Sequence, residues 1–205
     1  MQRSQIDDWK VLLIGGSSGV GKTVTARQLA NYLSISLLLL DDVRLALQAA
    51  TTPETHPDLH IFLHYSTEQW RESASIYRDW ITVGKAMLEP LKAVIHHHIL
   101  VPDVGRIIVE GDGILPMVSE LDFDPEDVRA VFVFEQEEQQ LLDNLRRRGR
   151  GFQEWGISEQ EGFAHASWLY GQWLAQEAGK RGVPVLPARP HQTLLERLSS
   201  IAKEH

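Results

Sequence analysis

The chain has 205 residues, no cysteine and a formal net charge of −8 at pH 7, because 28 acidic side chains outnumber 20 lysines and arginines. The lack of cysteine excludes a disulfide framework and a thiolate metal site, and the acidic balance argues against non-specific nucleic-acid binding. Apolar runs such as residues 37–40 are far too short to cross a membrane, and residues 1–10 are polar, unlike a signal peptide.

Short apolar runs alternate with helical segments along the chain. This alternation predicts an α/β protein of three layers, in which a five-stranded parallel sheet has helices on both faces. Strands that are buried on both sides typically have the near-continuous apolar character seen here. In chain order, strands are predicted at residues 11–14, 36–40, 106–110, 130–134 and 183–186, and helices at 22–34, 43–50, 67–99 in one or two pieces, 137–148, 158–178 and 192–203.

The remaining segments are expected to be irregular. Residues 51–66 hold two prolines and three histidines and are predicted to form an insertion, and residues 149–156, with three glycines, to form a mobile loop. The length suits one domain, residues 1–205, and we expect a cytoplasmic protein. The sequence leaves the oligomeric state open.

The segment after the first predicted strand has the most specific pattern in the chain. Residues 16–23 fit G-x-x-x-x-G-K-[ST], the phosphate-binding loop (P-loop). Together with the predicted sheet, this motif leads us to expect the three-layer fold of P-loop NTPases. Glycines there let the backbone direct successive N–H groups at phosphate oxygens, and the following helix adds its positive N-terminal end. We therefore expect an ATP site in which Lys22 is a solvent-reachable charge at the outer phosphates and the Thr23 hydroxyl binds Mg²⁺. The expected nucleotide-binding residues are Gly16, Ser17, Ser18, Gly19, Val20, Gly21, Lys22 and Thr23.

Asp41, Asp42 and Arg44 follow the second predicted strand. Ligands of open parallel sheets bind at the carboxyl ends of the strands. An aspartate there could accept a proton from an attacking hydroxyl, and an arginine one turn later could hold an anionic substrate group. We expect Asp41 to be catalytic and Arg44 to contact substrate, whereas Asp42 could cap a helix that begins at Val43.

Two further acids, Glu110 and Asp112, flank Gly111 at the end of the third predicted strand. In P-loop enzymes an acid at this place orients magnesium or its water ligands. Because an aspartate is more usual there than a glutamate, the sequence does not distinguish Glu110 from Asp112 as the metal residue. The alternative is an acidic surface turn without a ligand.

A basic run ends the helix predicted at residues 137–148. Its arginines are followed by glycines, so it could form a hinged lid over residues 146–156 that closes on the phosphates and neutralises transition-state charge. Arg147 and Arg150 are the candidate catalytic residues of this lid, although the sequence does not show which arginine enters the site. The alternative is a solvated helix end, where cations suit the helix dipole.

Aromatic and histidine residues at helical spacing have a structural explanation. For the tryptophans and tyrosines at 70, 77, 80, 168, 170 and 173 we expect a place in the core, and the alternative is a platform that contacts a ligand. The histidines at 56, 60, 64 and 96–98 have no acid or cysteine that completes a recognisable zinc site. Those near Tyr65 and Trp70 are expected to line a substrate pocket or to face solvent.

With these segments in order, the sequence resembles small-molecule kinases of the P-loop superfamily, and in particular 2-phosphoglycerate kinase-like proteins. The resemblance rests on residues 14–23, 41–44 and 109–116, and on the basic segment 146–150. It implies ATP- and Mg²⁺-dependent phosphorylation of a hydroxyl on a small anionic metabolite, with Asp41 as the base or substrate-orienting acid and Arg44 as a substrate clamp. The Glu-Gly strand end is also similar to that of uridine kinase-like enzymes.

Other nucleotide-binding classes fit less well. A GTPase would need an N-K-x-D segment that reads guanine, and none occurs. A pure ATPase or motor domain would show a clearer aspartate at the strand end. A non-catalytic nucleotide-binding regulatory protein has no need to keep both Lys22 and the pair of Asp41 and Arg44. A toxin-like kinase of nucleotide sugars is a further enzyme alternative.

Overall fold

A computed structural model describes residues 9–66, 68–149 and 151–203 of the chain. The described strands form one parallel sheet in the order β2-β3-β1-β4-β5. The central strand β1 lies between β3 and β4, so the chain first adds strands on one side of β1 and later on the other. Open α/β sheets bind ligands at this change of direction, at the carboxyl ends of the strands. The strands are β1 (Val11–Gly16), β2 (Ser36–Leu39), β3 (Ile107–Glu110), β4 (Val128–Phe134) and β5 (Val185–Pro187). The predicted five-stranded parallel α/β fold is confirmed.

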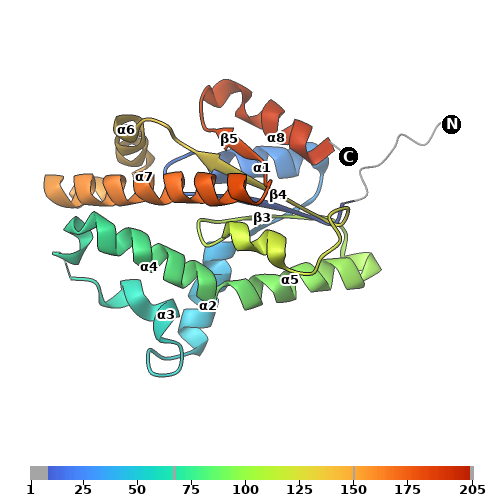
Figure 1. The fold of residues 1–205 in the computed structure, drawn as a ribbon, viewed down its shortest axis with the longest axis horizontal. Helices are drawn as coiled ribbons and strands as arrows, with labels where there is room; N and C mark the ends of the chain where they lie inside the picture. The colour runs from blue at the N-terminus through green and yellow to red at the C-terminus, as the bar shows by residue number, and fades with distance from the viewer. Residues whose placement is uncertain (1–8, 67, 150, 204–205) are drawn as a thin grey trace.

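Helices cover both faces of this sheet, because successive side chains of β1 point to opposite sides. Leu12 and Ile14 pack with α1, α6 and α8, whereas Val11 and Leu13 pack with α5 and much of α7. Figure 1 shows α1 and α8 on one side of the sheet and α5 on the other. The helices are α1 (Lys22–Leu33), α2 (Leu40–Ala50), α3 (Pro57–His60), α4 (Ser73–Ala86), α5 (Leu88–Leu100), α6 (Glu138–Arg148), α7 (Ile157–Lys180) and α8 (Leu194–Lys203).

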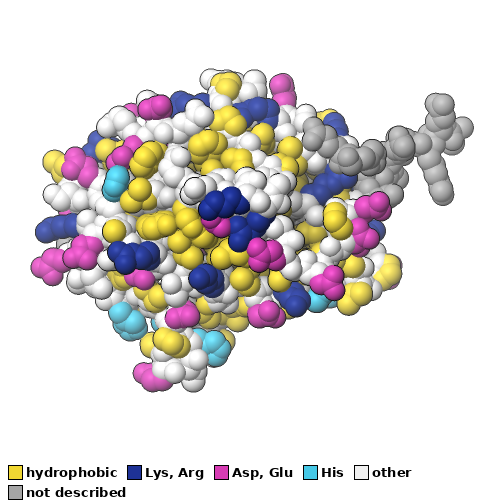
Figure 2. Space-filling view, in the orientation of Figure 1, with side chains coloured by type: hydrophobic (Ala, Val, Ile, Leu, Met, Phe, Trp, Pro, Cys, Tyr) yellow, Lys and Arg dark blue, Asp and Glu magenta, His cyan; other side chains and the backbone are white. Residues whose placement is uncertain are grey.

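The face of the molecule in Figure 2 mixes acidic and basic side chains, with a group of hydrophobic side chains where α4 and α7 lie. Tyr77 of α4 and Trp173 of α7 line a shallow depression there. No helix within the described ranges has both the length and the apolar character that a bilayer span requires.

Helix α2 begins earlier than the sequence predicts. Leu40, expected in the strand, is buried and opens the helix, and the extended Leu39 precedes it. Asp41 and Asp42 therefore lie inside the first helical turn, where their negative charges suit the helix dipole. The alternative that Asp42 caps a helix starting at Val43 is wrong.

The segment between α2 and α4 is more ordered than an irregular insertion. It contains α3 and two short 3₁₀ turns, Ile61–His64 and Gln69–Arg71. Its second turn packs against α7 at Gly162, where an added Cβ would lie 2.9 Å from the Trp70 carbonyl oxygen. A glycine at this position lets the two backbones meet.

We expect Gly162→Ala to destabilise the protein by about 1–3 kcal/mol, the usual cost of overpacking. The reason is that the three atoms nearest to the new methyl group all belong to the backbone of Trp70 and Arg71, which cannot rotate away. Urea unfolding measures the change. Gly179→Ala on the same helix, where an added Cβ meets no atom within 4 Å, is the matched control; equal stability of the two variants would contradict the prediction.

Candidate active site

The phosphate-binding loop joins β1 to α1 at the carboxyl edge of the sheet. Gly16 has φ +141°, and a Cβ there would lie 2.2 Å from the Val133 carbonyl oxygen, so the loop can leave the strand only at a glycine. Gly21 precedes the first turn of α1 with φ +91°, again a conformation that favours glycine. The loop thus delivers Lys22 and Thr23 to the N-terminal end of α1.

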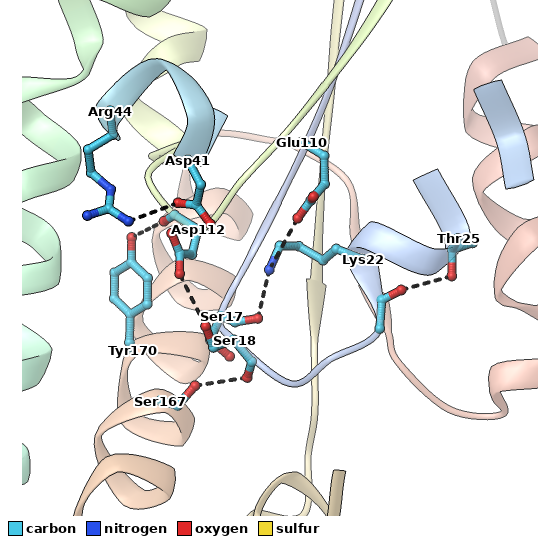
Figure 3. A network of polar contacts seen from close by, with 11 residues as sticks. Ser17, Ser18, Lys22, Thr25, Asp41, Arg44, Glu110, Asp112, Ser167 and Tyr170 are labelled. Carbon is cyan, nitrogen blue, oxygen red and sulfur yellow. Dashed lines mark hydrogen bonds and ion pairs between the residues drawn. The ribbon is translucent and has the colours of Figure 1, made fainter. Parts of the chain in front are cut away.

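Lys22 is buried rather than solvent-reachable, in contrast to the prediction from sequence. Its side chain is 6% exposed, and its Nζ donates a hydrogen bond to the Ser17 carbonyl oxygen at 2.8 Å. The Glu110 carboxylate, at the end of β3, lies 3.8 Å from the same Nζ and is equally buried (Figure 3). The neighbouring carboxylate explains how the ammonium group is accommodated away from water.

Asp112 connects the end of β3 to the loop. Its Oδ2 accepts a hydrogen bond from the Ser18 hydroxyl at 3.2 Å, and its carbonyl oxygen accepts one from the Tyr170 hydroxyl at 2.6 Å. Burial and, next, the charge of Asp41 raise the pKa of Asp112 to about 6, against the opposing effect of Lys22 and Arg44. Burial also raises the pKa of Tyr170, which keeps its hydroxyl a hydrogen-bond donor.

This raised pKa predicts a pH-dependent stability of the metal-free protein. Between about pH 4 and 6 the folded protein holds a proton on Asp112 that the unfolded chain has released, so stability falls as the pH rises, by about 3 kcal/mol. We expect Asp112→Asn to unfold at higher urea concentration than the wild type at pH 8, with little difference at pH 4. Parallel pH curves of the two proteins in EDTA would contradict this prediction.

One cavity of about 620 Å³ opens onto the loop and gathers residues from five segments. It brings together most of the side chains that the sequence singles out, whereas the Val20 side chain is buried in the core. The Ser17 side chain is also buried, and the Ser17 carbonyl oxygen accepts the hydrogen bond from the Lys22 ammonium group. Lining residues include Ser18, Gly19, Gly21, Lys22, Thr23, Asp41, Glu110, Asp112, Asn144, Arg147, Arg148 and His191.

A second cavity, of about 290 Å³, lies beside the first, since both are lined by Ser18, Asp41, Asp112 and Arg148. Arg44 lines this second cavity, and its guanidinium lies 3.4 Å from an Asp41 carboxylate oxygen. The remaining wall is largely aromatic, from Phe62, Trp70, Trp80, Phe152, Trp155 and Phe163. Trp70 and Trp80 are thus half-buried residues that line a cavity, where core packing was expected and a ligand platform was the alternative.

The basic segment after α6 divides into residues with different positions. Arg147 lines the first cavity and Arg148 lines both, whereas the Arg146 guanidinium donates to the Gln160 side chain at 2.9 Å. Arg150 lies outside the described residues. Beyond it, the buried Phe152 packs against Trp155, so the later part of the predicted loop is anchored by aromatic contacts.

Several residues that support the loop were not found by sequence reasoning. Asn144 of α6 donates to the Gly19 carbonyl oxygen at 3.1 Å, and Ser167 of α7 donates to the Ser18 carbonyl oxygen at 2.9 Å. Gly171 lets α7 approach the loop, because a Cβ there would lie 2.9 Å from the Ser17 hydroxyl. The spacing of Ser167, Tyr170 and Gly171 on one helical face is the signal that could have indicated this contact.

The residues fit magnesium better than a metal held by protein ligands alone. No group of three or more histidines, aspartates or glutamates that could hold a metal occurs within the described ranges. Mg²⁺, however, usually binds through one or two carboxylates together with phosphates and water. Thr23, Glu110 and Asp112 line the same cavity and supply such oxygens. His60 does not line this cavity; its Nε2 lies 3.0 Å from the Thr51 hydroxyl.

Comparisons with known proteins agree with this architecture. No protein-family model matches the chain. Over 121 residues, half of this chain, it is 31% identical to 2-phosphoglycerate kinase of Pyrococcus horikoshii, and it spans only 38% of the length of that relative. A shikimate kinase from Bacteroides thetaiotaomicron has a TM-score of 0.53 at 13% identity, over 95% of this chain and 99% of that one. An uncharacterized protein from Eubacterium ventriosum has a TM-score of 0.50 at 12% identity, over 96% of this chain and 99% of that one.

Structural likeness at such low identity shows the fold and leaves the activity to be argued from the site. The sheet has the order β2-β3-β1-β4-β5. The loop between β1 and α1 and the acids that follow β2 and β3 line the same cavity. The chain therefore has the α/β fold of the phosphate-binding-loop kinases.

Proposed function

We propose that the protein transfers the γ-phosphoryl group of ATP to a hydroxyl of a small anionic metabolite. The observation that carries this proposal is that two adjoining cavities, one on the phosphate loop and one beside it, share Asp41 and Asp112. A donor phosphate in the first cavity and an acceptor hydroxyl in the second would meet at these carboxylates. Holding two reactants in line is the main means by which phosphoryl-transfer enzymes act.

Each residue has a defined part in this proposal. Lys22 and the loop backbone bind the outer phosphates, and Arg147, which lines the same cavity, adds positive charge. Asp41, which lines both cavities, orients the acceptor hydroxyl or takes its proton. Arg44 and Arg148 line the acceptor cavity and support an anionic group on the acceptor. Thr23, Glu110 and Asp112 would hold Mg²⁺, which neutralises the charge of the phosphates.

ATP turnover with and without acceptors tests the proposal. We would measure ADP release and phosphorylated product with Mg²⁺ and a panel of hydroxylated metabolites with phosphate or carboxylate groups, 2-phosphoglycerate and shikimate among them. Stimulation by at least one acceptor, with product formed in equal amount to ADP, is the expected result. ATP binding without any transfer would instead support a non-catalytic regulatory protein, and transfer to nucleosides alone would support the uridine kinase-like alternative.

Closure of the arginine segment is a separate prediction. We expect amide hydrogen exchange of residues 146–156 to slow when a non-hydrolysable ATP analogue and an acceptor are both bound. Arg147 and Arg148 would then make charge-assisted contacts with phosphate that offset the cost of ordering. Equal exchange in the free and bound protein would identify the segment as an ordinary basic helix end.

A further inference from the structure

We propose that the acceptor is an aromatic or heteroaromatic molecule that carries a hydroxyl and an anionic group, rather than a short aliphatic hydroxy acid. This inference rests on the proposed function and defines its substrate class. It follows from the walls of the second cavity, the placement of its charges and its volume.

The aromatic wall of the second cavity consists of rings that contact one another. Phe62 and Trp70 stack with centroids 5.7 Å apart and an interplanar angle of 15°. Trp80 and Phe163 meet edge to face at 5.2 Å, and Trp155 packs against Phe163 at 5.6 Å. Trp70 also packs against Trp155 at 5.4 Å, so the rings form one continuous surface.

These rings are not fully enclosed, as residues of a core would be. Phe62, Trp70 and Trp80 are each half-buried, and Phe62 and Trp70 belong to neither of the two clusters of the hydrophobic core. When a flat apolar group of a ligand covers large aromatic surfaces that face a cavity, it removes them from contact with water, which is favourable. Stacking on such rings tolerates many ring systems, because every aromatic ring has a π-face.

Within the described part of the chain, the charged residues that line this cavity are Asp41, Arg44, Asp112 and Arg148. Asp41, Asp112 and Arg148 also line the nucleotide cavity, and Arg44 lies 3.4 Å from Asp41. A bound acceptor would therefore place its hydroxyl and its anionic group beside these residues, and its remaining atoms against the rings.

A short, highly charged acceptor fits these walls less well. Its charged oxygens would leave water and lie against rings that offer them no hydrogen bonds, and this transfer is unfavourable. A volume of about 290 Å³ lies near the lower limit of small-molecule pockets, which suits one ring system with a short polar substituent.

Matched pairs of acceptors that differ in the ring test the inference. We would measure the binding of lactate against 3-phenyllactate, and of ribose 5-phosphate against uridine 5′-monophosphate, by calorimetry on protein loaded with a non-hydrolysable ATP analogue and Mg²⁺. We expect the ring-bearing member of at least one pair to bind about 10- to 100-fold more tightly, the range of base stacking on aromatic side chains. Equal affinity within both pairs, or preference for the ringless members, would overturn the inference.

Two tryptophan variants show whether the preference comes from this cavity. Trp70→Leu should bring the affinity ratio within the responsive pair close to one. Trp168→Leu, a half-buried tryptophan that lines neither cavity, should leave the ratio unchanged. Thermal unfolding confirms that both variants are folded, and an unchanged ratio in folded Trp70→Leu would overturn the inference.

The binding measurement also separates this inference from the proposed function. Ring preference in binding without product would contradict phosphoryl transfer while keeping the aromatic site. Phosphoryl transfer with equal affinity for the ringless members would keep the kinase and exclude an aromatic acceptor.

Discussion

Replacing Lys22 by methionine should abolish phosphoryl transfer, with a loss of at least about 100- to 1,000-fold in kcat, the range seen when one preorganised charge-stabilising donor is removed. The ammonium group lies within a buried loop, bonded to the Ser17 carbonyl oxygen, and needs no large movement to meet a phosphate that enters the cavity. Methionine keeps a similar volume but no charge. The rate is measured as ADP release at saturating ATP and acceptor.

The single variant also leaves the buried Glu110 carboxylate without its cation. Breaking a buried pair by removing one partner typically costs about 3–5 kcal/mol of stability, so loss of folding could imitate loss of catalysis. The double variant Lys22→Met with Glu110→Gln removes both charges and should recover most of that stability. We expect it to remain inactive. Activity in the stable double variant would show that Lys22 is not required for transfer.

The loop and the sheet were accessible from sequence because their signals are local. The glycines, Lys22 and Thr23 occupy consecutive positions, and the turn between β1 and α1 needs φ values that glycine adopts readily. Apolar strands that are buried on both faces likewise stand out as uninterrupted runs. Both features are determined by neighbours in the chain, so a pattern of residue types is enough to predict them.

The burial of Lys22 and the start of α2 depend on contacts that sequence spacing does not encode. Glu110 lies next to Lys22 only because β3 is the neighbour of β1 in the sheet. Leu40 opens a helix because its side chain fits the core beside Gly111, where an added Cβ would lie 2.7 Å from the Leu40 Cβ. Tertiary packing of this kind overrides the local preference for a strand.

For the same physical reason, the sequence favoured the core over a ligand platform for the tryptophans that line the aromatic cavity. Trp70 and Phe163 are far apart in the sequence, yet their ring centroids are 5.8 Å apart across the contact between the second 3₁₀ turn and α7. Helical spacing alone cannot distinguish a tryptophan that packs in the core from one that faces a cavity. The distinction requires the neighbouring wall, which comes from another part of the chain.

Asp41→Asn should lower the rate of the chemical step by about 100- to 10,000-fold, the usual contribution of a general base, while ATP affinity changes little. The Asp41 side chain is 46% exposed and lies where both cavities meet, so asparagine keeps the packing and removes only the charge. Single-turnover kinetics separates the chemical step from binding, and calorimetry gives the ATP affinity.

Two neighbouring aspartates make this prediction sharper. Asp42 follows directly in the same helical turn but is exposed and lines neither cavity, so Asp42→Asn should keep the wild-type rate. Asp112→Asn should raise the Mg²⁺ concentration that gives half the maximal rate, as expected when a residue that helps to hold the metal is lost. Asp41→Asn should also lower the pKa of Asp112, because the charge of Asp41 is one of the causes that raise it. A large rate defect in Asp42→Asn, with normal chemistry in Asp41→Asn, would reverse the assignment within the pair.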